Sequence, residues 1–162
     1  MKLSNSVAMV VCVVLVVSGV SHGAIINFNF PIDTSQEVAP TVSPATGTGV
    51  AVFDTVTNQL DWNITFSGLT TAETGAHFHG PATIAQNAGV QIPLSLGSPK
   101  VGNFILSDVQ ETDLIAGLWY VNIHTVMFPG GEIRGQVVPE PATLSILAFG
   151  GLAFLRRRRS GR

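Results

Sequence analysis

The chain has 162 residues with a formal net charge of −2, and 46% of its residues are hydrophobic. This length suffices for one ordinary domain with its own core rather than for two. Between residues 24 and 138, two basic residues stand against nine acidic ones, a net charge of −7, which excludes the basic surface that nucleic acid binding needs.

The N-terminal segment has the parts of a secretory signal. Lys2 gives a positive start, an apolar run follows over residues 7–17, and small residues precede a cleavage site before Ala24. The run is too short to cross a hydrocarbon core of about 30 Å as a helix. We therefore predict a signal peptide over residues 1–23, removed by signal peptidase during passage through the inner membrane. The single cysteine, Cys12, lies in this segment, so the mature chain is expected to lack disulfides.

Residues 24–138 are predicted to form one all-β domain. Short runs of β-branched and aromatic residues are separated by Gly, Pro, Asn and Asp. Alternation is clearest in 60–66, where apolar side chains share one face and polar side chains the other. Many short antiparallel strands with one helical interruption indicate a single immunoglobulin-like β-sandwich. Strands are expected at 26–30, 49–53, 60–66, 76–79, 91–96, 101–106, 118–126 and 132–138.

The strand at 76–79 carries a possible pair of metal ligands. His77 and His79 share one face, with Cα atoms about 6 to 7 Å apart by strand geometry. This spacing offers two imidazoles to one metal ion. If the strand at 118–126 is its neighbour, His124 supplies a third imidazole, and a single Zn or Cu ion would be held with one position open.

A short helix is predicted directly after Ser107. Ser107 and Gln110 have the spacing of a capping box, and a glycine follows as a stop signal. Val109, Leu114 and Ile115 are expected to turn toward the sheet.

The last two predicted strands form a β-hairpin. Burying their apolar side chains together favours Val126 opposite Glu132, joined by a loop over 127–131. The expected result is a polar strip on the outer face of a hydrophobic hairpin, with Arg134 favouring the neutral form of His124. The facing pairs expected in this register are His124 with Arg134 and Asn122 with Gln136.

The polar residues of these motifs support a second interpretation. Instead of binding metal, they would form a hydrogen-bonded network that locks loops to the sandwich. The residue pattern leaves both interpretations open. The members of this alternative network are His77, His79, His124, Asn122, Glu132 and Arg134.

The C-terminal segment has three parts in a fixed order. The triplet Pro139-Glu140-Pro141 precedes a mostly apolar run over 142–155, and the basic cluster Arg156-Arg157-Arg158-Arg159 follows. A basic cluster behind an apolar run is held on the cytoplasmic side of a membrane. The order closely resembles the PEP-CTERM sorting signal, which we place at residues 139–162. The resemblance implies transient association with the inner membrane and recognition by a protease of the exosortase type.

The domain between the two signals also resembles a known family. About residues 26–138, nearly the whole predicted domain over 24–138, are similar to the CHRD (chordin-type) domain, which implies a β-sandwich module associated with extracellular binding. With the apolar runs of the two signals, we expect this sandwich to be flanked by hydrophobic targeting helices. The motifs that carry the resemblance are 35–40, 47–49, 58–60, 76–82, 120–125 and 129–136.

These observations predict a non-enzymatic, exported binding module at the surface or in the extracellular matrix of a polysaccharide-producing bacterium. Its expected partner is an extracellular polysaccharide or a surface protein, at the cell envelope or beyond it. The alternative is a histidine-based Zn or Cu protein, with redox activity as an option. A hydrolase has little support, because the predicted mature domain over residues 24–138 has no Gly-x-Ser-x-Gly motif and no cysteine. Enzymatic activity is otherwise left open.

Overall fold

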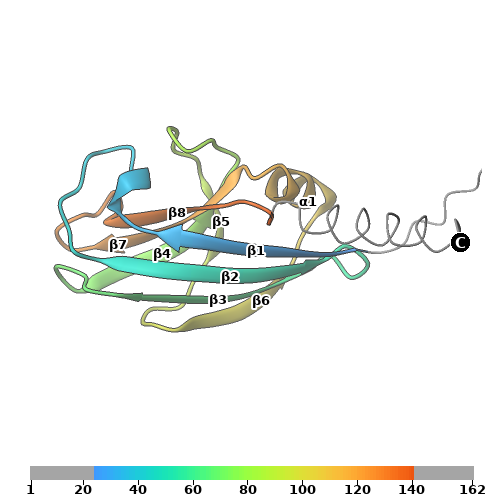
Figure 1. Ribbon diagram of the computed structural model, residues 1–162, viewed down its shortest axis with the longest axis horizontal. Coiled ribbons are helices and arrows are strands. Elements are labelled where there is room, and N and C mark those ends of the chain that lie inside the picture. The colour runs from blue at the N-terminus through green and yellow to red at the C-terminus, as the bar shows by residue number, and fades with distance from the viewer. Residues whose placement is uncertain (1–23, 141–162) are drawn as a thin grey trace, which may run out of the picture.

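The structure, a computed structural model, describes residues 24–140. Two antiparallel four-stranded sheets pack face to face as a sandwich (Figure 1). This arrangement confirms the predicted all-β class. The predicted signal peptide and the two flanking targeting helices lie at 1–23 and 141–162, outside the described residues. Within residues 24–140, none of the helices has the length and apolarity needed to span a membrane.

All eight predicted strands are confirmed, with ends that shift by a few residues. The first sheet has the order β1-β2-β3-β6, and the second has the order β5-β4-β7-β8. The strands of the first sheet are β1 (Ile25–Ile32), β2 (Thr46–Asp54), β3 (Gln59–Ser67) and β6 (Lys100–Ile105). Those of the second are β4 (Glu73–His79), β5 (Val90–Pro93), β7 (Trp119–Thr125) and β8 (Ile133–Val137).

The hydrophobic core lies between the two sheets. Its centre is aromatic, and the Trp62 ring of the first sheet meets the Phe78 ring of the second edge-on, with centroids 5.3 Å apart. Because successive side chains of a strand point to opposite faces, burying Phe78 and Ile123 in this core turns their chain neighbours outward. The outer face of the second sheet therefore carries His77, His79 and His124.

Helix α1 (Asp108–Ile115) begins with the predicted capping box of Ser107 and Gln110. Leu114 is its buried residue, whereas Val109 is 71% exposed and Ile115 38% exposed. The prediction that all three apolar residues face the sheet was therefore wrong for two of them. Positions five residues and one residue apart lie about 140° and 100° apart around a helix, so a single face cannot bury all three.

Strands β1 and β8 bring the edges of the two sheets together, as their neighbouring positions in Figure 1 suggest. Asp33 and Arg134 exchange two backbone hydrogen bonds, of 3.0 and 2.9 Å. The close approach depends on Gly135, where an added Cβ would lie 2.4 Å from the carbonyl oxygen of Pro31. This contact delivers the segment after β1, including the 3-10 helix η1 (Thr34–Gln36), to the outer face of the second sheet.

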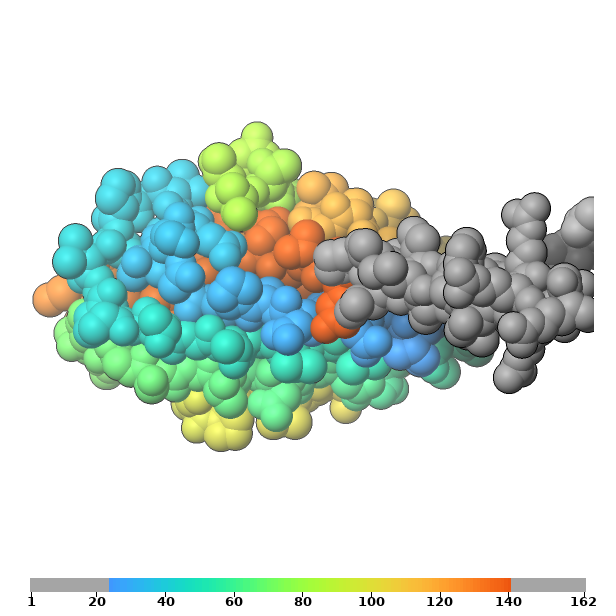
Figure 2. Space-filling model, in the orientation of Figure 1, coloured from blue at the N-terminus to red at the C-terminus, as the bar shows by residue number. Residues whose placement is uncertain are grey.

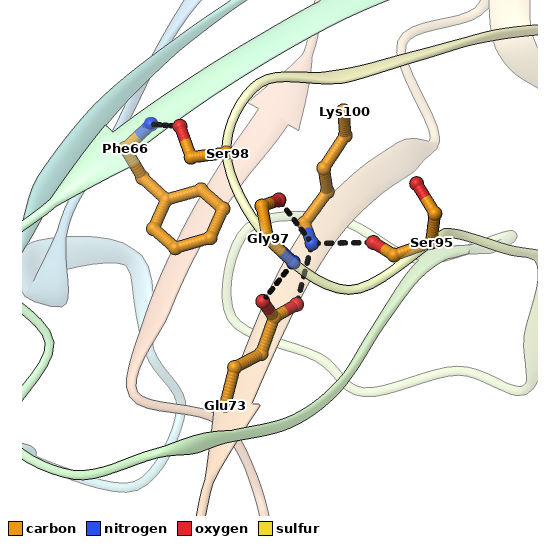
Figure 3. A network of polar contacts seen from close by, with 6 residues as sticks. All are labelled: Phe66, Glu73, Ser95, Gly97, Ser98 and Lys100. Carbon is orange, nitrogen blue, oxygen red and sulfur yellow. Dashed lines mark hydrogen bonds and ion pairs between the residues drawn. The ribbon is translucent and has the colours of Figure 1, made fainter.

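A buried lysine ties the two sheets together elsewhere (Figure 3). The Lys100 side chain is fully buried, and its ammonium group forms an ion pair with Glu73 of β4. The ammonium also donates to the carbonyl oxygens of Ser95 at 2.6 Å and Gly97 at 3.0 Å, and it lies 4.9 Å from the centroid of the Phe66 ring. These contacts fix the connection between β5 and β6 to the start of β4.

Candidate metal centre

Strands β4, β7 and β8 lie side by side in that order and present a row of polar side chains on their outer face. In the register of the sheet, His77 faces Asn122, and Asn122 faces Arg134. Two residues further along each strand, His79 faces Tyr120, and Tyr120 faces Gln136. The predicted adjacency of the two histidine-bearing strands is therefore correct.

The predicted hairpin register was wrong by two residues. Asn122, not His124, faces Arg134, because the turn is longer than expected and Glu132 donates its backbone N–H to Ile123 at 2.7 Å. A shift of two residues keeps every side chain on its original face. The apolar residues are therefore buried as predicted, although their partners differ.

The polar strip is also covered rather than exposed. Two loops, 33–44 and 80–89, close over it and rise as neighbouring lobes on one face of the molecule (Figure 2). Arg134 is 0% exposed and Asn122 is 2% exposed. The strip lies on the outer face of the sheet, as predicted, but it is buried because two loops from distant parts of the chain cover it.

Arg134 holds the 80–89 loop. Its guanidinium donates to the carbonyl oxygens of Gln86 at 2.8 Å and Thr83 at 3.1 Å, and to the side chain of Gln136 at 3.2 Å. The guanidinium carbon lies 3.4 Å from the centroid of the Tyr120 ring. Burial lowers the pKa of Arg134, and the nearby Tyr120 and Glu37 oppose that shift.

Glu132 holds a different set of loops. Its carboxylate accepts hydrogen bonds from the hydroxyls of Ser43 at 2.6 Å and Thr125 at 2.7 Å, and from the backbone N–H of Thr70 at 2.8 Å. Burial alone would raise the pKa of Glu132, but these hydrogen bonds outweigh it and hold the pKa below its ordinary value. Glu132 and Arg134 thus anchor loops, as the network interpretation expects, but through separate groups of partners.

The three histidines come together beside this region. The ring centroid of His77 lies 5.3 Å from that of His79 and 5.2 Å from that of His124, and the last two are 5.8 Å apart. One ring nitrogen from each residue lies within 4.8 Å of the others. Residues 47 positions apart in the sequence thus form one cluster, which we call the histidine triad.

Two of the triad rings are held by backbone carbonyls. The Nδ1 atoms of His79 and His124 lie 3.0 Å from the carbonyl oxygens of Ala88 and Pro129. A carbonyl oxygen only accepts, so Nδ1 carries the hydrogen and Nε2 keeps its lone pair. Within the described residues, the buried imidazole nitrogens without a partner are Nδ1 of His77 and Nε2 of His79 and His124.

The surroundings of the triad favour the neutral form of its imidazoles. Burial lowers the pKa of all three histidines. The charge of His77 lowers the pKa of His124 further, and the carbonyl of Pro129 opposes the shift. Arg134 was predicted to act on His124, but it lowers the pKa of His79 instead.

The triad fits a Zn or Cu ion. Nitrogen ligands about 2.0 Å from a tetrahedral ion are about 3.3 Å apart, so small inward movements of the rings bring the nitrogens from within 4.8 Å to bonding distance. His77 and His124 are half-buried as residues, although their unpartnered ring nitrogens are buried. Three neutral imidazoles are ligands that suit Zn and Cu, and they leave one position open.

Sequence reasoning missed the role of Glu37, which follows η1 and lies over the same face. Burial raises the pKa of Glu37 to about 7, while Arg134 and the side chain of Asn122 act to lower it. Nothing in the local pattern distinguishes this glutamate from a solvated one. Tyr120 was also missed, although its alternation with Asn122 and His124 was a usable signal.

Two family models match this chain. The model of the CHRD domain matches residues 28–137, and the model of the PEP-CTERM protein-sorting motif matches residues 137–159. Searches of curated proteins and of solved structures each found no match. The sorting motif indicates export to the cell envelope or the extracellular space. It also indicates processing by an exosortase during export. Since the first match covers more than half of the chain, the protein belongs to the CHRD domain family.

Proposed function

We propose that this exported domain binds one transition-metal ion, Cu or Zn, through His77, His79 and His124. The proposal is carried by two observations on the same three imidazoles: one ring nitrogen of each lies within 4.8 Å of the others, and each ring has a buried nitrogen without a hydrogen-bond partner among the described residues. Buried polar atoms normally have partners. A cation shared by the three rings would give these nitrogens the partner that they lack.

The surroundings of the triad support the same proposal. Metal-bound histidines usually donate their second ring N–H to a carbonyl or carboxylate, which fixes the ring. His79 and His124 have this arrangement with Ala88 and Pro129. The lowered pKa values of the three rings keep protons from competing with the ion near neutral pH.

The test is a metal titration of the purified full chain, kept in mild detergent and stripped with a chelator. We expect one ion per chain, with Cu(II) bound more tightly than Zn(II), as the general affinity order requires. Single replacements His77→Ala and His124→Ala should each abolish stoichiometric binding. His22 lies in the predicted signal peptide, so His22→Ala is the matched control and should bind like the unmodified protein. Equal, weak binding by all four proteins would refute the proposal.

A second candidate function, a module of the extracellular matrix, is favoured by the sorting motif over residues 137–159. In this proposal the signal peptide ends at residue 23, and the domain over 24–138 is presented to a polysaccharide or surface protein. Cosedimentation of the purified protein with the producer's polysaccharide tests it. A known polysaccharide-binding protein serves as the positive control. If the polysaccharide sediments that control but not this protein, the matrix role is refuted and the metal proposal stands.

A further inference from the structure

A second group of buried polar atoms without partners lies next to the triad. Within residues 24–140, these atoms include Oε1 of Glu37, Oδ1 of Asn122 and Nε of Arg134. Arg134 and Asn122 are almost wholly buried, at 0% and 2% exposed. Several such atoms in one place indicate that a polar molecule completes their hydrogen bonds.

The sheet register places these atoms beside the triad. Asn122 of β7 lies between His77 of β4 and Arg134 of β8. Facing residues in an antiparallel pair have Cα atoms about 4.5 to 5.5 Å apart, so the side chains of His77 and Asn122 rise together from one face. The carboxyl group of Glu37 interacts with both the Asn122 amide and the charge of Arg134. The unpartnered atoms therefore border the triad on its Arg134 side.

Glu37 is held in this position by the fold. Gln36, its chain neighbour, accepts a hydrogen bond from the backbone N–H of Gln136 at 2.7 Å. The backbone N–H of Glu37 itself donates to Thr34 at 3.2 Å. The segment before Glu37 is thus fixed to β8, and its carboxyl group is presented to the site rather than to solvent.

The unpartnered atoms have the chemistry that a metal-bound water needs. Three imidazoles leave the fourth position of a tetrahedral ion open. A water molecule on the ion uses a lone pair for the metal and keeps two hydrogens to donate. Glu37 Oε1 and Asn122 Oδ1 are two buried acceptors without a partner, and the Arg134 charge and the Asn122 side chain both act on the Glu37 carboxyl group.

We infer that the fourth ligand of the ion is a water molecule that donates its hydrogens to Asn122 and Glu37. The inference rests on the proposed function, because it assumes an ion on the triad. It assigns Glu37 and Asn122 as positioning residues, which act on the metal through its water ligand. It also makes this position the place where a small exogenous ligand, such as azide, would replace water.

The test uses the full chain loaded with Cu(II) and pulsed electron paramagnetic resonance in H₂O and D₂O. We expect deuteron signals from one water bound to the copper. The isosteric change Glu37→Gln should lower Cu(II) affinity by about 10-fold, in the range found when outer partners of metal ligands are removed, and should also strengthen azide binding. Asp61→Asn, which changes an exposed carboxyl on the other sheet, is the matched control and should alter neither property.

The outcomes separate this inference from the proposed function. Copper bound by three imidazoles without a water signal would overturn the inference and leave the metal proposal standing. Failure of the unmodified chain to bind copper would refute both. If Glu37→Gln changes neither the Cu(II) affinity nor the azide binding constant, Glu37 does not position the metal-bound water. Asn122→Ala tests the second acceptor, and if that variant does not fold, the isosteric Glu37→Gln alone decides the inference.

Discussion

The guanidinium carbon of Arg134 lies 3.4 Å from the centre of the Tyr120 ring, and the His79 ring stacks on the same tyrosine at 5.0 Å with planes 8° apart. Because β4 and β8 flank β7 on opposite sides, the arginine and the histidine contact Tyr120 from opposite sides. Tyr120 also accepts a hydrogen bond from the backbone N–H of Ala88 at 3.0 Å. One aromatic side chain therefore joins the anchor of the 80–89 loop to the histidine triad.

Arg134→Lys keeps the charge but removes the planar group that bonds two carbonyls and stacks on Tyr120. We expect a loss of about 2 to 4 kcal/mol in the free energy of unfolding, because a buried charge is left with incomplete partners. Amide hydrogen exchange in the 80–89 loop should accelerate more than exchange in β2. Uniform exchange changes across both regions would contradict the assignment of Arg134 as the anchor of that loop.

Lys100→Met tests the buried ion pair between the sheets. The single change leaves the Glu73 carboxylate buried without its cation, and we expect a cost of about 3 to 5 kcal/mol in urea unfolding. Replacing both partners, with Lys100→Met and Glu73→Leu together, removes the unpaired charge. The double variant should therefore be more stable than Lys100→Met alone, and a double variant that is less stable would show that the pair is not the main interaction.

The sandwich and its strands follow from the sequence because their signals are local. Alternation over 60–66 identifies a half-buried strand directly, and the capping box at Ser107 identifies the start of the helix. The convergence of His77 and His124 needed only one further assumption, that β4 and β7 are neighbours. That assumption was correct.

The burial of the site did not follow from the sequence, because its causes are not local. Arg134 is covered by residues about 50 positions earlier in the chain, and Glu132 bonds Ser43 and Thr70 from other loops. Polar residues on alternate positions of β8 look like a solvated face until these loops are placed. The hairpin register was missed for a related reason, since a shift of two residues preserves the facial pattern on which it was judged.

Gly135→Ala tests the close approach of β1 and β8. An added Cβ would lie 2.4 Å from the backbone oxygen of Pro31, which has no rotamer to change. We expect a loss of about 1 to 3 kcal/mol in stability from this overpacking. Gly89→Ala is the control, because an added Cβ there meets no atom within 4 Å. Equal unfolding midpoints for the two variants would contradict the packing of this edge.

The pH dependence of stability separates Glu37 from the histidine triad in metal-free protein. The folded triad has pKa values below 6.5, so the unfolded chain binds more protons, and the stability from the triad is present above pH 6.5 and lost as pH falls below it. Glu37 acts in the opposite sense. Its pKa rises from 4.5 to about 7 on folding, so its contribution is full below pH 4.5 and is lost as pH rises through about 7.

Glu37→Gln should therefore steepen the rise of stability between pH 5 and pH 7. Relative to the unmodified protein, we expect the variant to gain about 1 to 2 kcal/mol on going from pH 5 to pH 8, after allowance for solvent screening of a partly buried carboxyl. Urea unfolding at several pH values, with chelator present, measures the effect. Parallel curves for the two proteins would contradict the burial of Glu37, and Asp61→Asn should give the unmodified curve.

X-ray absorption at the bound ion tests the metal proposal most directly. For the copper- or zinc-loaded full chain, the account predicts three imidazole nitrogens about 2.0 Å from the ion plus one oxygen ligand from water. The His124→Ala variant should lose stoichiometric metal, and any ion that remains should show one imidazole fewer. Two results would contradict the assignment of the histidine triad as a metal centre. One is a spectrum of the unmodified protein without imidazole scattering, and the other is a spectrum that His124→Ala leaves unchanged.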